Sequence, residues 1–358
     1  MEIGLVGLPN AGKSTLFNAL TKAGAPAASY PFTTIEPNVG IVAVPDARLE
    51  KLSLLFKPEK TTPAVVRFVD IAGLVKGASQ GEGLGNKFLS HIREVDAIAQ
   101  VVRCFGGEVT HVAGQVGPGD DIETINTELA LADLATCEKR AQQLSRSVKS
   151  GDKDAAKLAA QLEDLVGLLS RGGLAVNFAA IDDFSDLHLL TAKPMILVAN
   201  IDEDDFRRGD YAASDPVKVY ADEHSCGWVV VSAKVEAELA ELDEEDAAVF
   251  REELGIEESS LDKLIHTGYR TLGLISFLTA GADECRAWTV RHGARAPEAA
   301  GVIHTDFAKG FIKAEVIVAG QLLDDGSEAA ARDKGHIRLE GKDYVVQDGD
   351  VMHFKFNV

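Results

Sequence analysis

The sequence predicts an α/β protein whose mainly parallel sheet is interrupted by a helical hairpin and followed by a smaller β-rich segment. Residues 122–169 are rich in Ala, Leu and charged side chains, with apolar positions three and four apart, which is typical of paired helices. Residues 273–358 return to strand-like patterns, at residues 286–290, 311–318 and 344–346. Elsewhere, short apolar runs before polar loops indicate buried strands, at residues 3–6, 39–44, 65–70, 97–102, 194–199 and 228–231.

Length and composition favour a soluble, cytoplasmic protein of two or three domains. The 358 residues exceed the usual size of one hydrophobic core. Apolar residues make up 46% of the chain and charged residues 26%, as in globular proteins. No run reaches the ~20 apolar residues of a membrane span, and the first residues enter a strand without a leader-like pattern. We therefore expect no membrane partner.

Cysteine spacing and net charge exclude some classes of function. Cys104, Cys137, Cys226 and Cys285 lie far apart, which argues against a zinc site or a disulfide framework. The formal charge of −20 opposes nonspecific binding of nucleic acid by the whole surface, although it leaves room for a local basic patch. An acidic composition is equally a means of staying soluble.

Residues 7–14 read Gly-Leu-Pro-Asn-Ala-Gly-Lys-Ser and match G-x-x-x-x-G-K-[ST], the P-loop that cradles nucleotide phosphates. A strand precedes the match and a helix follows from Thr15, so backbone amides and the positive end of a helix would face an anion. We expect Lys13 to act as a catalytic group on the β- and γ-phosphates and Ser14 to coordinate Mg²⁺. The alternative is a Gly-rich turn with a chance lysine, which this context disfavours.

Two further loops complete the expected γ-phosphate site. Thr34 lies in the Pro-bounded segment 27–38, where nucleotide switches place a Thr on Mg²⁺ and the γ-phosphate, although Thr33 also qualifies. Asp70 ends a predicted strand and begins D-x-x-G. We expect Asp70 to hold Mg²⁺ through its water shell and the Gly73 N–H to sense the γ-phosphate.

The residue after Gly73 is Leu74, at the position where Ras-type GTPases carry the Gln that orients the attacking water. Leucine has no polar side-chain atom, so we expect either slow hydrolysis or a water positioned by another group. His111, in a loop rich in Gly and Pro, is the candidate catalytic group, although a solvated loop histidine is the more common outcome.

Residues 122–169 predict two antiparallel helices joined at Gly151-Asp152, with a heptad seam on each. We expect an inserted arm that faces a partner, and a purely structural arm is an equally fair interpretation. The seam residues are Ala130, Leu134, Cys137, Ala141, Leu144 and Val148, then Leu158, Leu162, Leu165 and Leu169.

Two loops lie where GTPases recognise the base. Asn200-Ile-Asp-Glu203 stands at the position of N-K-x-D, and Ser232-Ala-Lys234 at the position of S-A-K. Ile201 replaces the Lys that packs on the base, and Glu203 replaces the Asp.

These replacements argue against strict guanine specificity. Guanine offers two donors, N1–H and the 2-amino group, to one carboxylate, whereas adenine offers an acceptor at N1 and a donor at its 6-amino group. An ionised carboxylate repels adenine N1, and the longer Glu203 no longer fits the guanine clasp. The amide of Asn200 supplies both a donor and an acceptor to a purine edge. Adenine is therefore the favoured base.

Together these motifs resemble the YchF / Obg-like ATPase family, and the resemblance extends over essentially the whole chain. It rests on residues 7–14, 30–38, 70–79, 200–203 and 279–358, which include Tyr-Pro-Phe-Thr-Thr-Ile-Glu-Pro-Asn and Asp-Ile-Ala-Gly-Leu-Val-Lys-Gly-Ala-Ser. Leu74 matches the hydrophobic substitution of that family.

The resemblance implies three domains in one α/β chain. They are a TRAFAC-class, Obg-type G domain that prefers ATP at residues 1–121 and 192–272, an inserted antiparallel α-helical coiled-coil domain at 122–191, and a C-terminal TGS domain of β-grasp shape at 273–358. It also implies slow ATP hydrolysis without the usual Gln and a role in translation or stress response. The expected partners are ATP, the ribosome (large subunit or 70S) and ribosomal RNA, and we expect a monomer.

The resemblance also assigns site residues. Nucleotide contacts are expected from Asn10, Ala11, Gly12, Lys13, Ser14, Thr15, Gly73, Phe105, Asn200, Ile201, Glu203, Ser232 and Ala233. Mg²⁺ would be held by Ser14, Thr34 and Asp70. Asn10 also resembles the asparagine that binds K⁺ in some GTPases with a hydrophobic substitution, so K⁺ is a second expected cofactor.

Within the C-terminal segment, Lys309, Phe311 and Lys313 combine positive charge with an aromatic ring, which suits contact with RNA. An ordinary solvated strand edge is at least as common for this composition. For the whole chain two rivals to the ATPase remain. One is a nucleotide-switched ribosome- or RNA-binding scaffold with incidental hydrolysis, and the other is an Obg-type GTPase, which Ile201 and Glu203 disfavour.

Overall fold

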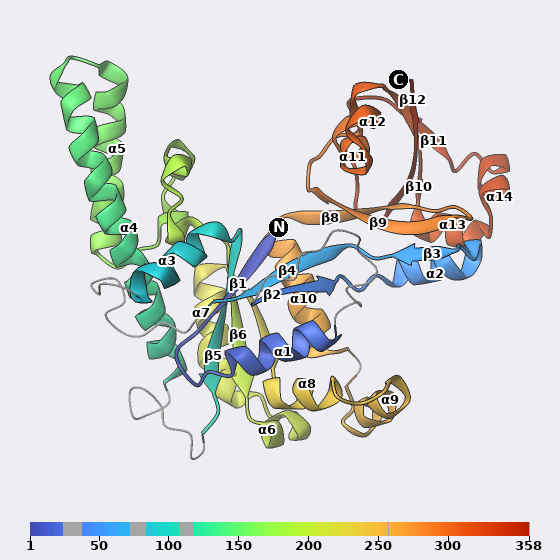
Figure 1. The fold of residues 1–358 in the computed structure, drawn as a ribbon, viewed down its shortest axis with the longest axis horizontal. Coiled ribbons are helices and arrows are strands. Elements are labelled where there is room, and N and C mark those ends of the chain that lie inside the picture. Colours follow the sequence, from blue (N-terminus) through green and yellow to red (C-terminus); the bar gives the residue numbers. More distant parts are fainter. Residues whose placement is uncertain (24–37, 72–83, 107–116, 257, 358) are drawn as a thin grey trace. The chain divides into compact units, whose positions relative to one another are not determined.

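The computed structural model describes residues 1–23, 38–71, 84–106, 117–256 and 258–357 (Figure 1). The chain divides into two compact units. Among the described residues, the first contains 1–23, 38–40 and 67–268, and the second contains 41–66 and 269–357. The three-domain division expected from the sequence stays a prediction.

The six strands predicted for the nucleotide domain form one sheet, nearly at the predicted residues. Its order is β2 (Val39–Ala43), β4 (Val65–Asp70), β1 (Glu2–Val6), β5 (Ala97–Cys104), β6 (Met195–Ile201), β7 (Gly227–Val231). Strand β1 pairs in parallel with β4 and β5, and β5, β6 and β7 continue in parallel. Every residue of β5 is buried, as expected of a parallel strand covered on both faces. The predicted α/β class is thereby confirmed.

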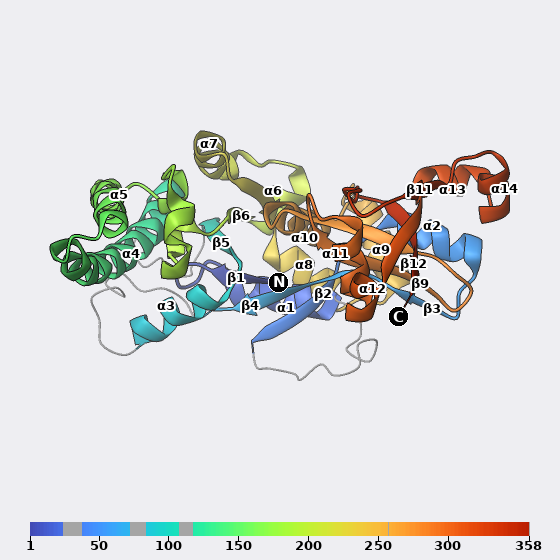
Figure 2. The same cartoon turned by 90° about the horizontal axis from the view of Figure 1, so that it is seen from above.

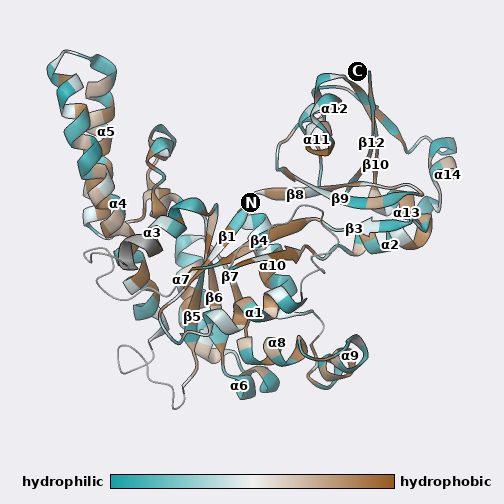
Figure 3. Cartoon of the chain, in the orientation of Figure 1, coloured by the Kyte–Doolittle hydropathy of each residue, from teal (hydrophilic) through white to brown (hydrophobic). Residues whose placement is uncertain are grey.

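Helices accompany this sheet, and the parallel pairing of β4, β1, β5, β6 and β7 places the carboxyl ends of these strands at one edge. The helices are α1 (Lys13–Ala23), α3 (Leu84–Glu94), α6 (Glu203–Arg208), α7 (Asp215–His224), α8 (Ala233–Leu239), α9 (Glu244–Glu253) and α10 (Ser260–Thr271). Figure 3 shows hydrophobic residues concentrated along the central strands. Gly268 in α10 lets that helix approach the sheet, because a Cβ there would lie 2.6 Å from Cδ1 of Ile3.

The predicted helical hairpin is confirmed as α4 (Pro118–Lys149) and α5 (Lys153–Ser170), which lie side by side in Figure 2. Asp152 begins α5 by accepting hydrogen bonds from the backbone N–H of Asp154 and Ala155. The seam packs as expected at Cys137, Leu162, Leu165 and Leu169, all buried, whereas Ala141 is exposed. The first half of α4 covers the sheet instead, through Ile122, Ile125 and Leu129.

The chain returns to the sheet through three short 3₁₀ turns, Ala175–Asn177, Ile181–Leu187 and Leu190–Ala192. Buried Asp133 on α4 fixes the last of them. Its carboxylate accepts from the N–H of Leu190 and Thr191 at 2.8 Å and from the Thr191 hydroxyl at 2.7 Å.

The second unit is a mixed sheet with helices, as expected of a β-grasp shape. The strand order is β11 (Arg338–Glu340), β10 (Phe311–Val318), β12 (Asp350–Phe356), β8 (Leu274–Thr279), β9 (Glu284–Arg291), β3 (Lys60–Thr62). Strands β8 and β12 pair in parallel, whereas β8–β9 and β10–β12 are antiparallel. The helices are α11 (Ala296–Ile303), α12 (Thr305–Lys309), α13 (Ala319–Asp325) and α14 (Glu328–Asp333).

Sequence reasoning was wrong about Phe311 and about residues 344–346. Phe311 is 4% exposed and packs in the core of the second unit with its ring 6.2 Å from that of Phe354, so it cannot stack on RNA bases. The expected strand at 344–346 is reduced to an isolated bridge between Val345 and Arg295. Strand β12 instead lies in the middle of the sheet, between β10 and β8.

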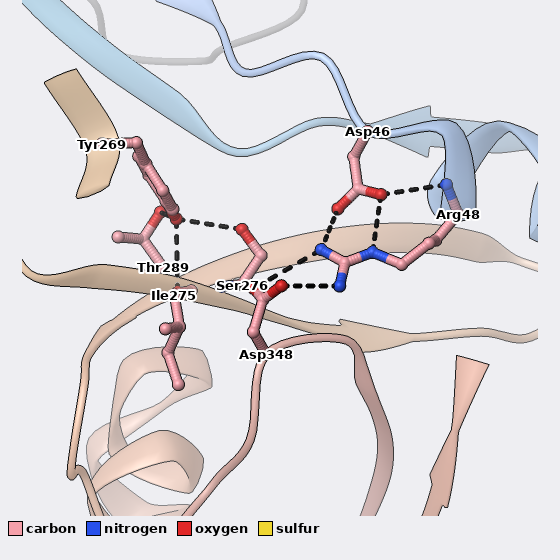
Figure 4. A network of polar contacts seen from close by, with 7 residues as sticks. All are labelled: Asp46, Arg48, Tyr269, Ile275, Ser276, Thr289 and Asp348. Carbon is pink, nitrogen blue, oxygen red and sulfur yellow. Dashed lines mark hydrogen bonds and ion pairs between the residues drawn. The ribbon is translucent and has the colours of Figure 1, made fainter. Parts of the chain in front are cut away.

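Residues 41–66 contribute to the second unit, which the sequence did not predict. Strand β3 pairs in parallel with β9, and helix α2 (Ala47–Phe56) contacts β9 and α13. Arg48 anchors this segment (Figure 4). Its guanidinium donates to both carboxylate oxygens of Asp46, at 2.9 and 2.8 Å, and to Asp348 at 2.7 Å. The same Asp348 accepts from the backbone N–H of Ser276 on β8.

No helix in the described ranges is long and apolar enough to span a membrane.

Candidate functional site

The P-loop turns tightly between β1 and α1, and its glycines are required by close approaches. A Cβ at Gly7 would lie 2.8 Å from the carbonyl oxygen of Val101. Gly12 has φ +89°, and a Cβ there would overlap the side-chain amide of Asn200. Asn10 also adopts a positive φ of 65°. The loop therefore exposes backbone next to the first turn of α1, as an anion site requires.

Residues 200–203, at the position of N-K-x-D, are called the base loop below. Asn200 begins this loop and joins it to the P-loop and to the start of α8. Its side chain is 3% exposed, its Nδ2 donates to the carbonyl of Ala11 at 2.9 Å, and its Oδ1 accepts from the N–H of Ala233 at 2.9 Å. Sequence reasoning assigned this amide to a purine edge, and that contact stays a prediction. The structure gives Asn200 a further role, which is to connect the P-loop to the start of α8.

Three of the predicted phosphate and metal residues meet at the start of α1. The Lys13 ammonium, in a side chain that is almost wholly buried, forms an ion pair with Oδ1 of Asp70. The Ser14 hydroxyl donates to the other oxygen of Asp70 at 3.2 Å. The P-loop and the end of β4 thus present an ammonium, a hydroxyl and a carboxylate together.

These donors fit Mg²⁺. A hydroxyl and a carboxylate oxygen are hard ligands of the kind that Mg²⁺ prefers, and the ion usually takes only one or two protein ligands beside waters and substrate phosphates. In the parts of the chain that the structure describes, no group of three or more His, Cys, Asp or Glu could form a metal cage of its own. Thr34, Gly73 and His111 lie outside the described residues, as do Thr33 and Leu74.

A cavity of about 400 Å³ opens beside the P-loop, within the size range of small-molecule sites. Its walls come from the P-loop, the end of β5, the base loop and the start of α8. The lining residues are Gly12, Thr15, Phe105, Asn200, Ile201, Asp202, Glu203, Asp204, Ala233 and Lys234.

Most of the predicted nucleotide residues therefore gather at this cavity or on the adjoining P-loop. Sequence reasoning did not single out Asp202, Asp204 or Lys234 as site residues, although Lys234 ends the S-A-K match. Ser232 is fully buried and is not one of the residues that line the cavity. Its hydroxyl has no hydrogen-bond partner among the described residues.

The guanidinium of Arg103 packs on the ring of Phe105 and fixes its position. The guanidinium carbon of Arg103 lies 4.6 Å from the centroid of the Phe105 ring, and its Nε donates to the Phe105 carbonyl at 3.1 Å. Arg103 is 1% exposed. A ring supported in this way presents a fixed apolar surface to the cavity.

Glu203 carries an ion pair on each carboxylate oxygen. Oε1 lies 2.7 Å from Nη2 of Arg207, and Oε2 contacts the ammonium of Lys234. The hydrogen bond from Lys234, above all, holds the pKa of Glu203 below its usual range, and the carboxylate in turn raises the pKa of Lys234. The Glu203 carboxylate is therefore ionised and paired with two cations.

Comparison with known proteins agrees with this arrangement. A family model described as 50S ribosome-binding GTPase matches residues 2–134, and the YchF-GTPase C-terminal model, described as a protein of unknown function (DUF933), matches residues 274–357. The chain is 54% identical to the "Ribosome-binding ATPase YchF" of Haemophilus ducreyi, over 100% of this chain and 99% of that protein. It is 53% identical to the protein of that name from Bacillus subtilis, with both chains fully covered.

A solved structure shows the same fold. The Schizosaccharomyces pombe YchF GTPase has a TM-score of 0.89 and 40% identity, over 99% of this chain and 97% of that one. A GTP-binding protein from Pyrococcus horikoshii, at 20% identity and a TM-score of 0.64, shares the fold. The chain has a P-loop after the first strand of a parallel sheet, an α4–α5 hairpin and a C-terminal β unit. Because it is also more than half identical to curated YchF proteins over its full length, this chain belongs to the YchF family.

Proposed function

We propose that the chain is a ribosome-binding ATPase that hydrolyses ATP to ADP and phosphate and uses the nucleotide as a conformational switch in translation or stress response. The observation that carries this proposal is the cavity that joins a P-loop to a base loop in which Glu203 is already ion-paired. The names of the bacterial relatives support both the ATPase activity and the ribosome as partner.

In this proposal the P-loop amides and Lys13 bind the phosphates, and Asn10, Ala11 and Thr15 complete the cradle. Lys13 exchanges its ion pair with Asp70 for the β- and γ-phosphates. Ser14, Thr34 and Asp70 hold Mg²⁺, which when bound neutralises charge that develops on the transferred phosphoryl group. Asn10 provides a site for K⁺.

The remaining residues bind the purine and favour slow turnover. Phe105, Ile201 and Ala233 contact the base, Asn200 meets its edge, and Ser232 supports the loop from behind. Gly73 senses the γ-phosphate. Because Leu74 cannot orient water, His111 or a group supplied by the ribosome does so, which makes hydrolysis partner-dependent.

The names of the bacterial relatives support the ribosome as the setting of this function. The protein works as a monomer in the cytoplasm and contacts the ribosome, as the large subunit or as 70S, together with ribosomal RNA. The domain bounds expected from the sequence, 1–121 with 192–272, 122–191 and 273–358, belong to this proposal.

Phosphate release tests the function directly. Purified protein with Mg²⁺ is given ATP or GTP, with and without 70S ribosomes. We expect turnover of ATP to exceed that of GTP by at least about tenfold at subsaturating nucleotide, which corresponds to one or two hydrogen bonds to the base. Ribosomes should accelerate ATP turnover.

The control is Lys13→Ala, which should abolish turnover of both nucleotides while leaving the fold intact by circular dichroism. Equal or faster turnover of GTP would make the chain an Obg-type GTPase, in line with the name of the fission-yeast relative, a YchF GTPase. Ribosome binding without any acceleration would favour a scaffold with incidental hydrolysis.

A further inference from the structure

Glu203 lines the cavity, and each of its two carboxylate oxygens is paired with a cation, one from α6 and one from α8. Arg207 follows one turn later on α6 and engages Oε1. Lys234 is the second residue of α8 and engages Oε2. The Glu203 side chain is 18% exposed, so water screens these pairs only in part.

Arg207 is itself held from two further directions. Its Nη2 lies 3.7 Å from Oε2 of Glu238 on α8, and its guanidinium carbon lies 5.4 Å from the centroid of the Phe250 ring on α9. A guanidinium fixed by a second carboxylate and an aromatic ring keeps one orientation toward Glu203. The Lys234 side chain, by contrast, is 69% exposed.

This arrangement determines which hydrogen bonds the Glu203 carboxylate can accept from a purine base. A carboxylate recognises guanine when both of its oxygens accept, one from N1–H and one from the 2-amino group. Each carboxylate oxygen has about two acceptor sites, and a cation at hydrogen-bond distance occupies one of them and fixes the direction in which the other points. The geometry points to Arg207 and Lys234 as specificity-determining residues that hold the Glu203 carboxylate off the guanine edge and so leave the cavity selective for adenine.

This inference rests on the proposed function, because it requires a purine nucleoside triphosphate in this cavity. It adds that the base preference depends on two cations that need not touch the base. Arg207 acts through Glu203 and is therefore a positioning residue.

The test measures ATP and GTP affinities by titration calorimetry with Mg²⁺ on the full chain. The principal variant is Arg207→Gln combined with Lys234→Gln, which frees both oxygens of Glu203. We expect its preference for ATP over GTP, taken as the ratio of dissociation constants, to fall by about tenfold or more. A third change, Glu203→Gln, removes the freed carboxylate and should return the ratio to within about threefold of the parent.

Arg208→Gln is the matched control. Arg208 is the neighbour of Arg207 on the same helix, pairs with Asp205 at 2.6 Å, and leaves Glu203 untouched. For this variant, the ratio of the dissociation constants for the two nucleotides should equal that of the parent. Lys234→Gln alone, at an exposed position, keeps the test informative if the double variant misfolds, and it should shift the ratio in the same direction by a smaller factor.

The outcomes separate this inference from the proposed function. If the parent binds GTP as tightly as ATP, the proposed adenine preference fails, whatever the variants do. If the parent prefers ATP and the double variant keeps that preference within about threefold, the role of the two cations is overturned and the ATPase stands. An equal shift in Arg208→Gln would also overturn it, since the effect would then be a general loss of positive charge.

Discussion

At the scale of single residues, Asn200 links the P-loop to residue 233 at the start of α8. Its amide satisfies the carbonyl of Ala11 and the N–H of Ala233, and both bonds are buried. Asn200→Ala leaves those two backbone groups without partners, at a cost of about 1–3 kcal/mol each. We expect a loss of roughly 2–4 kcal/mol in the free energy of unfolding and a loss of nucleotide affinity of at least about tenfold.

Urea denaturation without nucleotide measures the first effect, and calorimetric titration of ATP measures the second. Asn126→Ala is the control, because Asn126 is another buried asparagine, whose Nδ2 donates to the hydroxyl of Tyr220 instead. It should lower stability and leave ATP affinity unchanged. A variant at Asn200 that binds ATP as the parent does would contradict the bridging role.

The P-loop could be predicted from sequence because its determinants are contiguous: Gly7, Gly12, Lys13 and Ser14 lie within eight residues. The pairing of Glu203 with Lys234 could not. Lys234 lies on another strand–helix unit, and its approach depends on the parallel pairing of β6 with β7. A motif fixes which residue types are present, whereas the orientation of a side chain is set by neighbours that the motif does not contain.

At the scale of elements, Arg48 connects helix α2 to the rest of the second unit through Asp348. Asp46, which also caps α2, has a side chain only 8% exposed and relies on this guanidinium for its charge balance. Arg48→Met should therefore lower the stability of the second unit by about 1–3 kcal/mol, less than for a fully buried pair because Arg48 is partly exposed. Thermal unfolding followed by near-ultraviolet circular dichroism measures this loss.

The matched control lies in the same unit. Arg295 pairs with Asp343 at 2.8 Å, but both side chains are well exposed, at 60% and 92%. Arg295→Met should cost less than about 0.5 kcal/mol. If both substitutions cost the same, the Arg48 network contributes no more than an ordinary surface ion pair.

The elements of the second unit show where sequence reasoning reached its limit. Strand β10 was predicted at its observed residues because its apolar run is long and local. The participation of residues 41–66 was not, because β3 is only three residues long and its partner β9 begins at Glu284. Such a pairing leaves no periodic signal near Lys60. Strand β12 was missed because Asp350, His353 and Lys355 interrupt its apolar pattern.

At the scale of the whole molecule, the two compact units are interleaved along the chain. Residues 41–66 leave the first unit, contribute α2 and β3 to the second, and return in β4. A cut at the predicted boundary between residues 272 and 273 would therefore remove the partners of α2 and β3. Thr62, which is buried and bonds to Glu284 at 2.5 Å, would be exposed by that cut.

A truncated chain of residues 1–272 tests this consequence. The unpaired β3 edge and the uncovered face of α2 should make it prone to association, which size-exclusion chromatography with light scattering measures. The matched control is the same truncation with residues 45–63 replaced by a short Gly/Ser linker. It should stay monomeric, because it lacks both unpartnered elements, and it should retain the ATP affinity of the full chain, because every described residue of the cavity lies in the first unit. If the simple truncation is as monomeric and as stable as the control, residues 41–66 do not depend on the second unit, and a boundary at 272 separates two self-sufficient parts.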